Sequence, residues 1–148
     1  MTAPGGNAAF APALPGAGFR TCPATGRHIH LGAERLIKVH AVASVVALLV
    51  GAIAAVMLVL TRWQAVHLLP AVWFYRILGV HGMSMLIFFI IFFEMAVLYF
   101  ASTVLINARQ VAPKAGWAAF GLMVGGALLV EAMMWGGKAD VLFTSYVP

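Results

Sequence analysis

The sequence predicts an all-α polytopic membrane protein with three transmembrane helices and a cytoplasmic N-terminus. Of its 148 residues, 64% are hydrophobic and only 9% are charged, whereas soluble domains are about half apolar and about one quarter charged. Three long apolar segments follow one another between short polar connections. Backbone polar groups in lipid must be hydrogen-bonded within their own segment, so we expect each segment to be a helix.

The beginning of the chain differs in composition from the rest. It contains MTAPGGNAAFAPALPGAG, which is rich in alanine, glycine and proline and shows no periodicity. We therefore expect residues 1–34 to form a flexible tail and residues 35–148 to form the transmembrane domain. The helices are expected at about residues 36–60, 79–106 and 115–135, which leaves short connections between them.

Lysine and arginine side chains near the helix ends predict the orientation in the membrane, because cytoplasmic loops carry an excess of them. Six belong to the N-terminal flank and the second connection, and three belong to the opposite side. This distribution predicts that the N-terminus is cytoplasmic and that residues 107–116 form a short cytoplasmic turn. Pro113 in this turn is expected to limit the second helix and to help start the third. The basic residues are scattered singly, so no nucleic-acid partner is expected in spite of a pI of about 10. The six are Arg20, Arg27, Arg35, Lys38, Arg109 and Lys114, and the three are Arg62, Arg76 and Lys138.

His81, at the start of the second apolar segment, is the first candidate functional residue. An imidazole at this position can ligate a metal or can simply hydrogen-bond at the membrane interface. At about 100° per residue, His81 aligns with aromatic and sulfur-containing side chains that could form the wall of a haem site. The same side chains could equally fill a helix interface, and helical spacing does not separate the two readings. The stripe comprises Ser84, Met85, Phe88, Phe92, Met95 and Tyr99.

Three other polar residues lie in or near the apolar segments. Glu94 is in the middle of the second segment, about 220° around the helix from His81. A carboxyl at that depth is costly, so we interpret Glu94 as a proton relay, a contact with a partner subunit, or a neutral carboxyl bonded to a neighbouring helix. Glu131, near the end of the third segment, is expected to be an interfacial group that reaches water. His40 is expected near the cytoplasmic start of the first helix.

One long stretch resembles a known family. The sequence YRILGVHGMSMLIFFIIFFEMAVLYFASTVLINARQVAPKAGW, followed by GGKADVLFTSYVP, resembles the start of catalytic subunit I of haem-copper oxygen reductases, especially the B-type oxidases and their nitric-oxide-reducing relatives. The likeness covers about residues 35–148. In that family a histidine–glycine pair opens the second transmembrane helix on the outer side, and a Tyr-x-Pro pattern follows the third helix. His81 with Gly82, and SYVP at residues 145–148, match these motifs.

The resemblance implies roles for three residues. His81 matches the axial ligand of the low-spin haem, and Met85 and Phe88 become candidates for packing against that haem. It assigns no role to Glu94. The family's subunit has twelve or more helices, and the high-spin haem, the copper and their ligands belong to the later ones. The resemblance therefore implies that this chain is a truncated or split first part of such a subunit, not catalytic by itself.

The resemblance also implies a function and its partners. Electrons from cytochrome c, a copper protein or quinol would pass through the low-spin haem to oxygen, with proton transport across the cell (inner) membrane. The expected partners are the lipid bilayer, the remaining helices of the subunit and an electron-donor subunit. Two alternatives stay open: a nitric oxide reductase-type subunit, and a non-catalytic three-helix accessory subunit in which His81 is an interface residue. A di-haem cytochrome would need a histidine facing His81, which neither His40 nor His67 is expected to provide.

Overall fold

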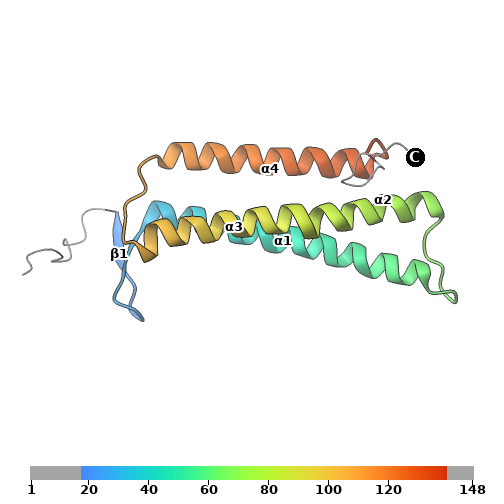
Figure 1. Cartoon of the computed structure of the whole chain (residues 1–148), viewed down its shortest axis with the longest axis horizontal. Coiled ribbons are helices and arrows are strands. Elements are labelled where there is room, and N and C mark those ends of the chain that lie inside the picture. Colours follow the sequence, from blue (N-terminus) through green and yellow to red (C-terminus); the bar gives the residue numbers. More distant parts are fainter. Residues whose placement is uncertain (1–17, 140–148) are drawn as a thin grey trace, which may run out of the picture.

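The structure, a computed structural model, describes residues 18–139, and these are mostly helical (Figure 1). A short hairpin comes first and is followed by three long helical rods. The second rod is continuous although it contains two π-helical stretches. In chain order the elements are β1 (Phe19–Thr21), β2 (His28–His30), α1 (Leu31–Arg62), α2 (Ala71–Gly82), η1 (Met83–Phe88), α3 (Phe89–Phe100), η2 (Ala101–Leu105) and α4 (Pro113–Trp135).

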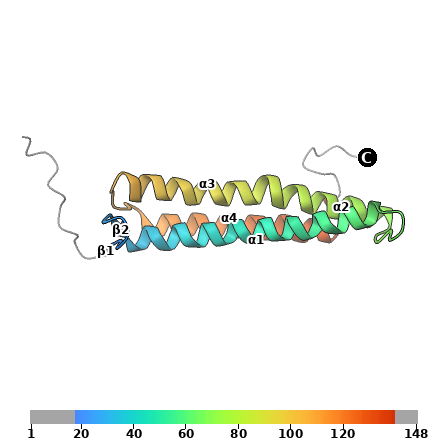
Figure 2. The same ribbon diagram turned by 90° about the horizontal axis from the view of Figure 1, so that it is seen from below.

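Within residues 18–139, three helices are long and apolar enough to cross a membrane, which confirms the predicted fold class. They are Leu31–Arg62, the second rod Ala71–Leu105, and Pro113–Trp135. The three rods run alongside one another in both views (Figures 1 and 2). Large apolar side chains such as Leu98 and Leu122 remain exposed on them, as expected for helices that face lipid or further helices.

The described part of the predicted tail, residues 18–34, contains a hairpin and the start of α1. β1 pairs antiparallel with β2, so that Phe19 lies opposite His30. The His30 imidazole then accepts a hydrogen bond from the backbone N–H of Ala33 and caps α1. Amino-acid composition alone does not reveal a helix cap or a hairpin turn. The turn of this hairpin contains Gly26 at a φ of +67°, which glycine adopts readily. Residues 1–17 of the predicted tail lie outside the described residues.

The helices also begin earlier than their apolar cores suggest. α1 starts at Leu31 and α2 at Ala71, before the expected residues 36 and 79. The expected ranges cover only the charge-free cores, whereas Arg76 lies inside α2 with its guanidinium 5.0 Å from the centre of the Trp73 ring. α4 begins at Pro113, which confirms the predicted role of this proline in starting the helix.

α1 packs mainly against the second rod, whereas α4 is more loosely attached. A buried cluster joins α1, α2 and α4 at the end of the bundle far from the hairpin. Within α4 the structure describes only Gly116 and Met134 as buried, so much of this helix lies open. The cluster consists of Ala54, Leu58, Ile77, Val80 and Met134.

The basic residues separate between the two ends of the bundle. The start of α1, the end of η2 and the start of α4 lie at the hairpin end (Figure 1), and these segments carry the larger basic group. The end of α1, the start of α2 and the end of α4 lie at the other end. The predicted orientation depends on this separation of basic residues, and the cytoplasmic location of the N-terminus remains a prediction.

Candidate functional site

His81 lies in the last turn of α2 and is half-buried. Its Nδ1 is 2.9 Å from the carbonyl oxygen of Gly51 on α1. A carbonyl oxygen can only accept, so Nδ1 carries the hydrogen and donates it. Nε2 is then the ring nitrogen that keeps a lone pair. Metal-binding histidines usually donate their other N–H to a carbonyl or carboxylate in this way, so His81 is oriented as a ligand should be.

The backbone changes directly after His81. Residues Met83–Phe88 form the π-helix η1, in which hydrogen bonds reach one residue further than in an α-helix. The side chains of the predicted stripe therefore do not all lie on one face of the rod. Ser84 and Phe88 line a groove beside α4, whereas Met85 packs against Gly51. Contact of Met85 and Phe88 with a haem remains a prediction.

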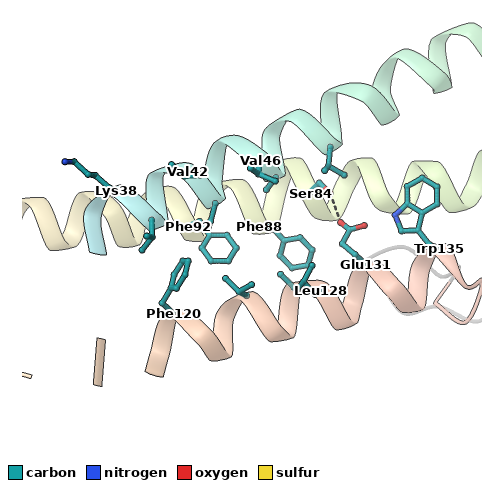
Figure 3. Close-up of a pocket in the computed structure, with 16 residues that line it drawn as sticks. Lys38, Val42, Val46, Ser84, Phe88, Phe92, Phe120, Leu128, Glu131 and Trp135 are labelled. Atoms are coloured by element: carbon teal, nitrogen blue, oxygen red, sulfur yellow. Dashed lines mark hydrogen bonds between the residues drawn. The ribbon is translucent and has the colours of Figure 1, made fainter. Parts of the chain in front are cut away.

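A groove of about 640 Å³ lies between α1, the second rod and α4. Its walls are largely apolar, with valines and alanines from α1 and the rings of Phe88, Phe92 and Phe120 directed into it (Figure 3). Lys38 lies at the hairpin end of the groove. His81 is not one of its lining residues, so the groove and the His81 imidazole are separate features of the same bundle.

A carboxyl lies toward the other end of the groove, before Trp135. Ser84 Oγ donates a hydrogen bond to Glu131 Oε1 at 2.6 Å (Figure 3), and Ser84 is only 1% exposed. Glu131 Oε2 is buried and has no hydrogen-bond partner among the described residues. The prediction that the Glu131 carboxyl reaches water is wrong, because α4 directs it inward, where Oε1 accepts from Ser84 and Oε2 is buried. The interfacial position of Glu131 stays a prediction. No local sequence signal marks a contact between two different helices.

Glu94 lies on the opposite, outward surface of α3. It is exposed, and apolar neighbours such as Ile91 and Leu98 are exposed with it. Across residues 18–139 the carboxyl of Glu94 makes no hydrogen bond or ion pair. The structure therefore brings Glu94 neither to His81 nor to the Ser84–Glu131 pair.

His40 is fully buried between rings from two other helices. Its Nδ1 donates to the Leu36 carbonyl oxygen at 2.8 Å, and its ring centre lies 4.8 Å from that of Phe120 and 5.4 Å from that of Tyr99. Nε2 is buried and unpartnered within the described region. His40 contacts residues near the hairpin end of the bundle, so the two membrane histidines do not come together.

No group of three or more His, Cys, Asp or Glu side chains within residues 18–139 could hold a metal ion. A haem iron can take a single histidine from one segment of a protein and its second axial ligand from elsewhere. A lone histidine whose other nitrogen is fixed is compatible with that chemistry. A structural zinc site, in contrast, needs four protein ligands.

Residues 35–148 match the family model described as cytochrome c and quinol oxidase polypeptide I. The match covers most of the chain and includes nearly all of the three long helices. No curated protein and no solved structure matches the sequence.

Proposed function

Because this chain belongs to the cytochrome c and quinol oxidase polypeptide I family, we propose that it forms the first part of the catalytic subunit of a respiratory haem-copper terminal oxidase. In this proposal His81 would hold the iron of a low-spin haem. The observation that supports it is the hydrogen bond from His81 Nδ1 to the Gly51 carbonyl oxygen, 2.9 Å long, which leaves Nε2 available for iron.

The residues around His81 suit a haem-binding role. When bound, the haem supplies a one-electron carrier. The His81 imidazole offers Nε2 as the ligand atom, and the Gly51 carbonyl fixes the ring plane and makes Nε2 more basic. Gly51 is buried and Met85 packs on it, so the acceptor of the hydrogen bond that orients the ring lies inside the bundle.

The predicted orientation of the bundle determines on which side of the membrane electrons would reach His81. With the N-terminus in the cytoplasm, the end of the bundle that carries α2 faces outward, and His81 lies near the outer face of the cell membrane. We propose that cytochrome c, a copper protein or quinol delivers electrons there. Oxygen would be reduced, with proton transport, at a high-spin haem and copper held by other helices of the subunit. Residues 18–139 supply no ligand cluster for those metals.

Deleting the gene in its host and measuring gas uptake by isolated membranes tests this function. We expect oxygen uptake to fall, a plasmid copy of the wild-type gene to restore it, and a copy carrying His81→Ala to leave it low. Loss of nitric oxide consumption in place of oxygen uptake would identify a nitric oxide reductase. Restoration by the His81→Ala copy would show that His81 is not a required ligand and would favour an accessory subunit.

A further inference from the structure

We propose that Gly51 is the positioning residue for His81. The absence of a side chain at this position lets α1 approach η1 so closely that the Gly51 carbonyl reaches the imidazole. This inference rests on the proposed function, and it adds the residue of α1 that determines the orientation and basicity of the ligand. Gly51 lies 30 positions from His81 in the sequence, so no local motif identifies it.

The space beside Gly51 is already filled by Met85. A Cβ atom at Gly51 would overlap Met85 Cγ, and it would lie 2.8 Å from Met85 Sδ and 3.4 Å from the Met85 backbone nitrogen. The distance to the backbone nitrogen is an ordinary van der Waals contact, so the conflict lies with the Met85 side chain. Its Cγ atom is too close to the η1 backbone for a movement of the far end of the side chain to relieve it. Gly51 is itself buried in α1, so a larger residue has no free space to enter. Even alanine must therefore displace the Met85 side chain and, through it, move η1 away from α1.

This separation would act directly on His81. Its Nδ1 and the Gly51 oxygen are 2.9 Å apart, near the optimum for such a bond, and a hydrogen bond weakens quickly beyond about 3.2 Å. The ring would lose the acceptor that fixes its plane and its tautomer. A less basic Nε2 stabilises ferric iron less, so the midpoint potential of the haem should become more positive.

Other glycines show that this constraint is local. At Gly121, Gly125 and Gly126 on α4, a Cβ atom would meet nothing within 4 Å. Adding a methyl group at Gly121 therefore changes helix propensity as it does at Gly51 but pushes no neighbour. Gly121→Ala is a matched control for Gly51→Ala.

The test compares the intact protein, isolated from membranes with its partners, in five forms. These are the wild type, Gly51→Ala, Met85→Ala, Gly51→Ala with Met85→Ala, and Gly121→Ala. The readouts are the electron paramagnetic resonance signal and midpoint potential of the low-spin haem, and the haem retained during purification. We expect Gly51→Ala to shift the potential positively and to lower haem affinity by about 10- to 100-fold.

The double variant should return both values toward those of Met85→Ala alone, because the shortened side chain makes room for the new methyl group. Gly121→Ala should match the wild type. A Gly51→Ala protein with the wild-type potential and haem content would overturn the inference. So would a double variant that stays as defective as Gly51→Ala, because the contact with Met85 would then not be the cause.

A wild-type protein that lacks low-spin haem would contradict the proposed function and leave the positioning role to a separate measurement. Nitrogen-15 NMR of His81 provides it without any haem. We expect hydrogen on Nδ1 in the wild type and a mixture of tautomers in Gly51→Ala. Identical His81 shifts in the two proteins would overturn the role of Gly51.

Discussion

Ser84 on η1 and Glu131 on α4 are joined by a hydrogen bond of 2.6 Å between Oγ and Oε1. The two residues line the apolar groove, and the second carboxyl oxygen of Glu131 is buried without a partner in the described region. Little of α4 is buried against the other rods, so this bond should add appreciably to the contacts that Gly116, Phe120 and Met134 make with them.

Replacing Ser84 with alanine should destabilise the bundle. The substitution leaves both oxygens of Glu131 without a protein donor, which costs about 1–3 kcal/mol of unfolding free energy. Ser102→Ala is the control, because the exposed Ser102 hydroxyl donates only to carbonyl oxygens of its own helix, those of Leu98 and Tyr99. Denaturant-induced unfolding, with all proteins in the same detergent, measures the loss of unfolding free energy in each variant. An equal loss for both variants would mean that the link to Glu131 contributes nothing specific.

Arg20 should control the order of the hairpin without affecting the membrane helices. Its Nε and Nη2 donate to the two Glu34 oxygens at 2.7 and 2.9 Å, and this bonding raises the pKa of the Arg20 guanidinium. Arg20→Gln should speed hydrogen–deuterium exchange in residues 19–30 and leave the centre of α1 unchanged. Arg27→Gln, a change at an exposed hairpin residue, is the control.

The effect of Arg20→Gln on the hairpin should not depend on pH near neutrality. A group whose pKa is raised on folding contributes stability at every pH below its unfolded value, and that contribution is lost only above it. The unfolded value of arginine lies far above neutrality. The exchange difference between wild type and Arg20→Gln should therefore be the same from about pH 6 to about pH 9. A difference that vanishes within this window would contradict the role given to the guanidinium.

Glu94 should matter for association with other helices. It is exposed among apolar side chains and has no partner within residues 18–139, so we propose that it accepts a hydrogen bond from a helix of the wider complex. Glu94→Leu should reduce co-purification of partner polypeptides, up to about tenfold, while the haem spectrum stays unchanged. Glu94→Gln, which keeps an acceptor, should lose much less. Undiminished recovery with Glu94→Leu would favour a lipid-facing carboxyl.

Hydropathy and charge predicted the features that depend on one segment at a time. The three spans follow from the cost of unpaired backbone groups in lipid, and Pro113 starts α4 because a proline is favoured in the first turn of a helix. The basic residues separate to the two ends of the bundle as their positions suggested. Each of these results needs no knowledge of which helix faces which.

The site could not be derived in the same way. The sequence identified His81, but its partner Gly51 and the inward position of Glu131 depend on how three helices pack. A constant turn of about 100° per residue holds only in a regular α-helix, and the π-helix η1 begins shortly after His81. The hairpin was missed for a similar reason, since alanine, glycine and proline composition does not register the pairing of β1 with β2.

The central claim is that His81 Nε2 binds the iron of a low-spin haem, and replacement of the side chain by free imidazole tests it most directly. His81→Gly removes the ligand and leaves a space of its size, while His40→Phe serves as a control at a buried histidine elsewhere. The measurement is the low-spin haem signal in electron paramagnetic resonance, with and without added imidazole. We predict that His81→Gly loses the signal, that imidazole restores it, and that His40→Phe keeps it. A His81→Gly protein that retains the wild-type signal without imidazole would contradict the account.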